Sequence, residues 1–289
     1  MLAVGVALAV SLAVLAVASS GGHHRNKDYA PFADCPLSNP VTDVCIFAQA
    51  ESGELIIGKK TIPVTRTMTL QGGAHQNEAT GKQEFIGAEG GDTFSRTPQV
   101  VPGGLYGIVA PKLLPKILRE LFYEFIAQGA ADVTATTELA APASSIGVNT
   151  QNLIEAKGIG LSLPVKVKLS NPFLGESCYI GSNANPIVMS LTTGTTHPSP
   201  LHKPITGKPG HAKFKDEYNL ITIEEDSLLS DSFAAPSVEG CGGILSFLVD
   251  PAVDAGLGVP VPAGDNETIL NGTLRDANAP AVRASRRER

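Results

Sequence analysis

The feature that most constrains this chain is a series of short strand patterns separated by turn-forming residues. The clearest is residues 165–169, in which apolar residues alternate with Lys166 and Lys168 at a period of two. This alternation indicates a strand with one face on a core and the other in water. Comparable stretches occupy residues 45–50, 54–57, 61–70, 132–139, 187–193, 218–224, 245–249 and 267–274. The sequence therefore predicts a mainly β fold, an antiparallel sandwich or barrel-like domain.

One helical pattern interrupts the strands, at about residues 115–127. Apolar residues recur there with the helical period, with charged residues between them. Pro115 suits the first helical position. The apolar stripe includes Ile117, Leu121 and Phe125 and has two interpretations. It caps the open end of the β core, or it forms a surface that contacts a membrane or a partner.

Residues 1–18 form an uncharged apolar run that ends in Ala16-Val17-Ala18. This small-x-small ending is typical of a signal peptide before its cleavage site. The first basic residues, Arg25 and Lys27, follow the run instead of preceding it. The alternative is a retained membrane anchor, because eighteen helical residues come close to the roughly 30 Å of a bilayer core. We expect a secreted, extracellular protein, or else one anchored through residues 1–18.

Four cysteines, Cys35, Cys45, Cys178 and Cys241, agree with export. An even, small number of cysteines in an oxidising compartment usually means disulfides. Three pairings are possible. We favour Cys35–Cys45 with Cys178–Cys241, because the first pair brackets a turn rich in Pro, Asn and Asp and the second closes a long loop.

Charge and length define the expected domain organisation. Six of the 22 basic residues but only one of the 28 acidic residues lie outside residues 28–282, so that body carries 16 basic and 27 acidic side chains. An acidic body argues against a nucleic-acid partner. We expect a single β-rich domain over residues 28–275. The arginine-rich residues 276–289 predict a disordered basic tail.

No local motif for catalysis, cofactor binding or metal binding is present, so the sequence predicts no such residues. We considered three sets of candidates on composition alone. These are His197, His202 and His211 for a metal, Asp250, Asp254 and Asp265 for calcium, and Glu120, Glu124, Glu176, Glu224, Glu225 and Asp226 for glycoside cleavage. The histidine spacing is irregular, the aspartates lack the EF-hand spacing, and the chain has no Trp and only five Tyr to stack on sugars.

Four stretches of the chain are distinctive: residues 103–111, 163–169 with 171–175, 178–182, and 240–243. Together they resemble the uncharacterised secreted proteins of actinomycetes such as streptomycetes. The resemblance covers most of the chain after the leader. It implies an exported protein with two early and two late cysteines. It implies no activity, because that family has no assigned catalytic residues.

These observations lead to a functional expectation that rests on the absence of catalytic motifs. We expect a non-catalytic secreted or envelope-associated binding or structural protein, with an unknown envelope or extracellular partner and no cofactor. The alternative is a secreted hydrolase whose site is assembled from distant loops.

Overall fold

The computed structural model describes residues 27–77, 82–106, 108–110, 112–128, 130–198 and 201–287. These residues build one sheet of 14 strands, and its strand pairs are antiparallel. The expected mainly β, antiparallel fold is therefore confirmed. The expected leader, residues 1–18, lies outside the described residues.

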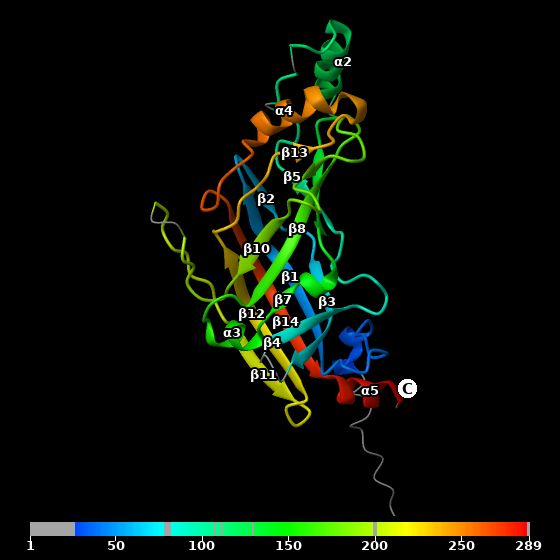
Figure 1. The fold of residues 1–289 in the computed structure, drawn as a ribbon, viewed down its shortest axis with the longest axis vertical. Coiled ribbons are helices and arrows are strands. Elements are labelled where there is room, and N and C mark those ends of the chain that lie inside the picture. Colours follow the sequence, from blue (N-terminus) through cyan, green and yellow to red (C-terminus); the bar gives the residue numbers. More distant parts are fainter. Residues whose placement is uncertain are drawn as a thin grey trace, which may run out of the picture.

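Figure 1 shows the elements along the chain. The strands are β1 (Val44–Ile57), β2 (Lys60–Pro63), β3 (Met68–Asn77), β4 (Lys82–Gly87), β5 (Pro98–Val101), β6 (Val133–Leu139), β7 (Gly147–Val148), β8 (Leu161–Ser170), β9 (Tyr179–Ile180), β10 (Ile187–Leu191), β11 (His211–Lys215), β12 (Leu220–Ser230), β13 (Val238–Glu239) and β14 (Glu267–Asn278). The helices are α2 (Lys116–Ala127), α3 (Thr150–Glu155), α4 (Ser246–Leu257) and α5 (Ala279–Arg287), with short 3-10 helices η1 (Ala30–Phe32), η2 (Ala143–Ser145) and η3 (Gly243–Leu245).

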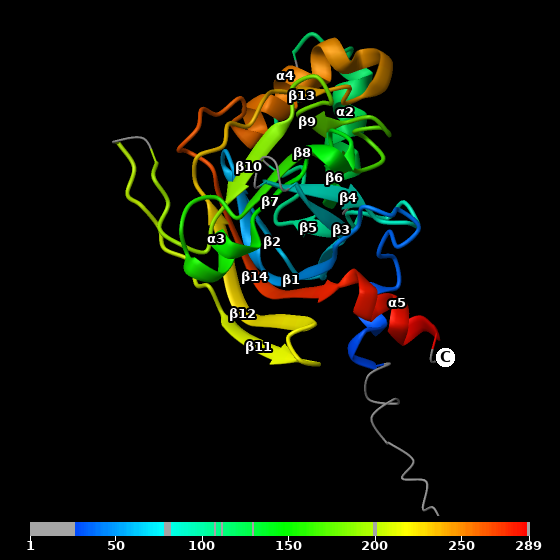
Figure 2. The same cartoon turned by 60° about the horizontal axis from the view of Figure 1, so that its bottom comes forward.

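The sheet bends into a roll that is not closed. Its strands follow the order β11-β12-β14-β1-β3-β4-β7-β8-β6-β5, and β10 and β9 also pair with β8. Figure 2 shows β8 and β10 lying across from β12 and β14. Only one residue pair joins β12 to the end of β10, with Thr192 and Leu229 exchanging two backbone hydrogen bonds of 2.9 Å. The fold is thus a barrel-like roll of one sheet and not a sandwich of two.

A double β-bulge is centred on Gly272 in β14. Opposite Gly272, β1 has an extra residue between Ala50 and Ser52, and β12 has one between Glu224 and Asp226. Each bulge bends its strand and increases the local twist. Because both bulges lie opposite Gly272, the two strands beside β14, β1 and β12, bend at the same position along β14.

Gly272 is required at this position by the close approach of β1. A Cβ atom on Gly272 would lie 1.8 Å from the backbone oxygen of Gln49. We predict that Gly272→Ala lowers the free energy of unfolding by at least about 1–3 kcal/mol, the usual cost of overpacking. Gly90→Ala is the control, because the nearest atom to its Cβ, in the Asp34 side chain, is 3.3 Å away. Equal denaturation midpoints for the two variants would contradict this role of Gly272.

The apolar residues form two clusters on opposite faces of the sheet. The larger cluster fills the roll and includes Val165, Ile187 and Leu191, each fully buried. The smaller cluster lies on the outer face, where Phe32 of η1 and Val282 of α5 cover the disulfide of Cys45. Figure 1 shows α5 beside the blue N-terminal part of the described chain at one end of an elongated molecule, and α2 with α4 at the other.

The expected disordered tail at residues 276–289 is wrong over the part that the structure describes. There β14 continues to Asn278, and α5 follows it directly. Ala281 and Val282 of α5 are buried against the outer cluster. Arg286 donates hydrogen bonds to the backbone oxygens of Phe32 and Ala33, at 3.1 and 2.7 Å. Arg286, one of the basic residues on which the prediction of disorder rested, therefore binds α5 to the η1 segment.

The strand expected at residues 245–249 is also wrong, because these residues begin α4. A short apolar run does not distinguish a strand from a buried helix, and Pro251 inside the helix hides the helical signal. Tertiary contacts hold α4 in place. Asp250 accepts the N–H groups of Gly240 and Cys241, and Asp254 accepts the N–H of Val238.

Both favoured disulfides are present. Cys35–Cys45 joins the segment after η1 to the start of β1, and Cys178–Cys241 joins the segment before β9 to the segment after β13. All four cysteines are buried. Two buried disulfides indicate a protein that folds in an extracellular or otherwise oxidising compartment.

The disulfide that closes the longer loop contributes more stability in the chain-entropy model. The two bonds span 10 and 63 residues, which corresponds to about 3 and about 4 kcal/mol. We predict a larger loss of unfolding free energy for the Cys178→Ala, Cys241→Ala pair than for the Cys35→Ala, Cys45→Ala pair. Thiol titration of the unfolded, unreduced protein should detect no free thiol. A smaller loss for the long-loop pair would contradict the ranking.

Candidate functional site

The histidines considered as metal ligands do not form a site. His211 begins β11, and His202 lies 3.5 Å from Asp265, from ring nitrogen Nε2 to carboxylate oxygen Oδ1. Over the part of the chain that the structure describes, no group of three His, Cys, Asp or Glu side chains could hold a metal ion. Asp250 and Asp254, considered for calcium, instead bind backbone N–H groups beside β13.

The carboxylates considered for glycoside cleavage are spread over three parts of the fold. Glu120 and Glu124 lie on α2, Glu176 lies in the segment before β9, and the others lie on β12. Glu224 forms an ion pair with Lys213 of β11. Of the six, Asp226 is the buried one. The structure therefore does not bring these residues together as a set.

Large apolar side chains are exposed on the elements at one end of the molecule, where Figure 1 shows α2 and α4. They are eight side chains from α2, the segment before it, and the η3–α4 region. We call this set the apolar tip; it comprises Tyr106, Val109, Leu113, Ile117, Leu121, Tyr123, Ile244 and Phe247. Large contiguous apolar surfaces are uncommon on soluble proteins and mark contact sites. Sequence reasoning identified only the α2 part of it.

The core beneath the apolar tip is formed mainly by other residues, and of the eight only Tyr123 is seen to pack on Phe122 and to accept the Ala110 N–H, among the described residues. Phe122 is 1% exposed, and its ring lies 4.5 Å from that of Phe173. Phe125 packs against the same ring from 6.3 Å. Ile117 and Leu121, by contrast, are 74% and 58% exposed. Of the stripe expected to cap the core, Phe125 does so in part, while Ile117 and Leu121 face solvent.

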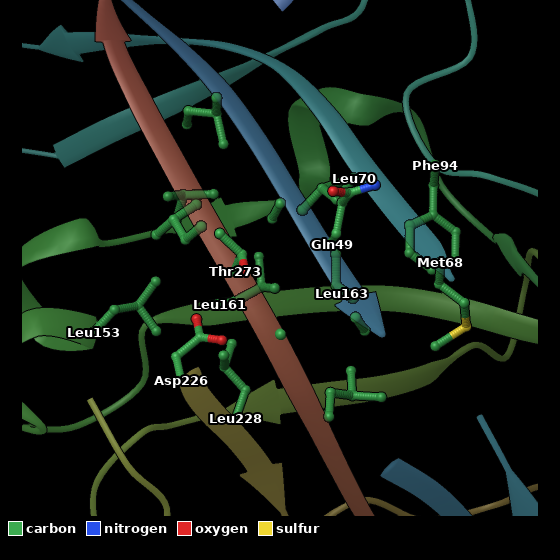
Figure 3. A pocket seen from close by; sticks show the side chains of 17 residues that line it. Gln49, Met68, Leu70, Phe94, Leu153, Leu161, Leu163, Asp226, Leu228 and Thr273 are labelled. Carbon is green, nitrogen blue, oxygen red and sulfur yellow. The ribbon is translucent and has the colours of Figure 1, made fainter. Parts of the chain in front are cut away.

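A second feature is an apolar cavity of about 70 Å³ inside the roll (Figure 3). Its walls come from β1, β3, β8, β12 and β14, with Val148 of β7, Leu153 of α3 and Phe94. One acid, Asp226, lines it, because the bulge in β12 turns this side chain inward. Burial raises the pKa of Asp226 to about 6, although the backbone N–H of Gly272, bound to the carboxylate, lowers it.

A second buried acid, Asp276, lies on the same face of β14 as Leu274, two residues before it. Burial raises the pKa of Asp276 to about 6, and a hydrogen bond with the Thr150 side chain limits the increase. The other carboxylate oxygen of Asp276, Oδ1, is buried without a hydrogen-bond partner among the described residues. Asp276 and Thr150 therefore connect β14 to the start of α3.

A third feature is a polar cleft of about 390 Å³ on the outside of the roll. It lies where β3, β4, β7 and β8 approach the start of α3. Its side chains are uncharged; they comprise Gln76, Gln83, Val148, Asn149, Gln151, Ile159 and Ser162, with the glycines Gly147 and Gly160. Its volume falls in the range of small-molecule sites. Nothing in the local sequence indicated this cleft.

Comparisons with known proteins add no family or activity. No protein-family profile, curated protein or solved structure matches the chain. Within the described ranges, no helix combines the length and apolar character needed to span a membrane. Function must therefore be argued from the three features above.

The buried acids predict an unusual dependence of stability on pH. Both have a folded-state pKa of about 6, above the 3.8 of a free Asp, so folding takes up protons between these values. Stability from these groups is full below about pH 4 and is lost as pH rises through about 6. We predict that Asp276→Asn, which keeps the acceptor for Thr150, raises the free energy of unfolding at pH 7 by on the order of 2 kcal/mol.

The measurement is denaturant unfolding at pH 4, 5, 6 and 7. Asp226→Asn should act in the same direction, because its amide oxygen can still accept the Gly272 N–H. Glu124→Gln, on the exposed surface of α2, is the matched control. If the free energy of unfolding of Asp276→Asn differed from that of the wild type by the same amount at every pH, the raised pKa would be contradicted.

Proposed function

We propose that this protein is a secreted, non-catalytic binding protein that docks on lipid surfaces of the cell envelope through its apolar tip. The observation that carries the proposal is the exposure of eight large apolar side chains above a core formed around Phe122 and Phe173. Covering Ile117 and Leu121 is unnecessary for packing, so their exposure points to an external contact. The two disulfides support an extracellular setting.

The charges beside the apolar tip favour a lipid surface as the occupant. Residues 112–124 carry three cations, Lys112, Lys116 and Arg119, against two anions, a net charge of +1 in a chain whose net charge is −6. Long cationic side chains can reach headgroups while their stems stay in apolar surroundings. Apolar residues interleaved with cations are typical of helices that lie in a membrane interface.

The position of the apolar tip agrees with docking from one end. In Figure 1 the tip forms one end of the molecule, opposite α5 and the outer cluster. A projecting end can enter a headgroup layer without the rest of the roll approaching it. The tyrosines Tyr106 and Tyr123 are about half exposed, and tyrosine is enriched where apolar and aqueous phases meet.

We predict that the exported protein floats with phosphatidylcholine–phosphatidylglycerol vesicles and less well with phosphatidylcholine alone. Replacing Ile117 and Leu121 together by Glu should reduce vesicle partitioning by about 100-fold, since each buried apolar side chain contributes at least about 1.5 kcal/mol. Thermal unfolding should change little, because both side chains are exposed. The measurement is flotation over a lipid titration.

The control replaces two exposed apolar residues far along the chain from the apolar tip, Leu201 and Phe214, by Glu. This control should bind vesicles like the wild type, and any retained leader is common to all variants. Failure of the wild type to bind either vesicle would overturn the proposal. So would equal losses in the two double variants, or a dimer that dissociates when Ile117 and Leu121 are replaced.

A further inference from the structure

Among the described residues, the side chains that line the polar cleft offer hydrogen-bond donors and acceptors and are uncharged. The side-chain oxygens of Gln83 and Asn149 accept the backbone N–H groups of Thr150 and Asn152, at 3.2 and 2.9 Å. The amide nitrogens of these two side chains are then left as donors. Gln151 uses its nitrogen on Glu155, at 2.8 Å, so its oxygen is left as an acceptor. Such a lining suits a neutral group that both donates and accepts, such as a hydroxyl or an amide.

Val148 links this cleft to the interior of the roll. Val148 is half-buried and is among the residues that line both the polar cleft and the apolar cavity, and its pairing with Leu161 places its side chain on the cavity face of the sheet. Leu161, its partner in β8, lines the cavity too. The uncharged outer cleft and the apolar inner cavity therefore share one residue as a wall.

The strand pairing at this wall is short. Strand β7 has two residues, and it pairs with β4 through the single pair Glu84–Gly147. Segments with few sheet hydrogen bonds open locally at low free-energy cost. Val148 can therefore move without breaking the long strand pairs that hold the roll.

The size of the cavity limits what can enter it. Its volume of about 70 Å³ is about half of the roughly 150 Å³ of an engineered apolar cavity that binds benzene. A chain of a few carbons fits this space, and a long acyl chain does not. The one acid among the described wall residues, Asp226, accepts the Gly272 N–H, and burial raises its pKa to about 6, which favours the neutral carboxyl beside an aliphatic tail.

We propose that the polar cleft and the apolar cavity form one binding site for a neutral amphiphile, with its hydroxyl- or amide-bearing head in the cleft and a short aliphatic tail passing Val148. This site is separate from the apolar tip and does not depend on the proposed docking function. The head is selected by hydrogen bonds without charge, and the tail is selected by length.

The test uses alkyl glucosides as probes. Binding is followed by calorimetry and by amide chemical shifts in the full exported protein. Butyl glucoside should bind saturably and at least 10-fold more tightly than methyl glucoside, octyl glucoside and the matching butyl glucuronide, whose head is charged. The shifts should concentrate at Ser162 and Leu163 and not at the apolar tip.

Two variants of the shared wall examine the path of the tail. Val148→Phe should remove the advantage of butyl over methyl glucoside, and Val148→Ala should move the optimum to a longer chain. Val188→Phe, at an exposed position of β10, is the control and should leave the series unchanged. If Val148→Phe does not fold, the chain-length preference of Val148→Ala and the amide chemical shifts of the wild-type protein still test the proposal.

Three results would overturn the proposal. One is no saturable binding of butyl glucoside. Another is a chain-length preference that Val148→Ala leaves unchanged. The third is affinity that rises steadily to octyl glucoside and disappears when Ile117 and Leu121 are replaced by Glu. That last result would identify adsorption on the apolar tip, which supports the docking function while excluding the internal site.

Discussion

The close contact between Gly272 and the backbone of Gln49 is the constraint on which the rest of the structure depends. It allows β14 to lie between two bulged strands, and the paired bulges bend the sheet until β10 and β12 meet at one residue pair. The same bulge turns Asp226 toward the interior, where the Gly272 N–H holds its carboxylate. The curvature, the cavity and the raised pKa of this acid thus have one local origin.

The two ends of the roll are finished in different ways. At one end η1 and α5 cover the outer cluster, and Arg286 is bound to backbone oxygens of the η1 segment. At the other end α2 and α4 pack around Phe122, and the exposed side chains of the apolar tip lie outside this core. The first end is covered by the protein's own chain. The second presents surface that internal packing does not use, which is why we assign it the external contact.

Strands were predictable from sequence where one face is buried and the other solvated. In β8 the alternation at residues 165–169 places Val165 and Val167 in the core. Lys166 and Lys168 lie on the opposite face. Prediction failed where contacts distant in sequence decide the conformation. The helix α4 depends on carboxylates that bind β13 and its neighbours, and α5 depends on η1, so neither has a reliable local signal. The polar cleft had none, because its lining comes from four separate segments.

By itself, the sequence determined the mainly β class and the α2 helix, because period-two and helical periodicities reflect local backbone geometry. It also favoured the correct cysteine pairing, from the short and long loops that the pairs close. Only the tertiary structure decided which half of the α2 stripe is covered, where the bulges place Asp226, and that Val148 separates a polar cleft from an apolar cavity. Periodicity shows that a side chain belongs to an apolar face; what covers that face depends on elements far away in the chain.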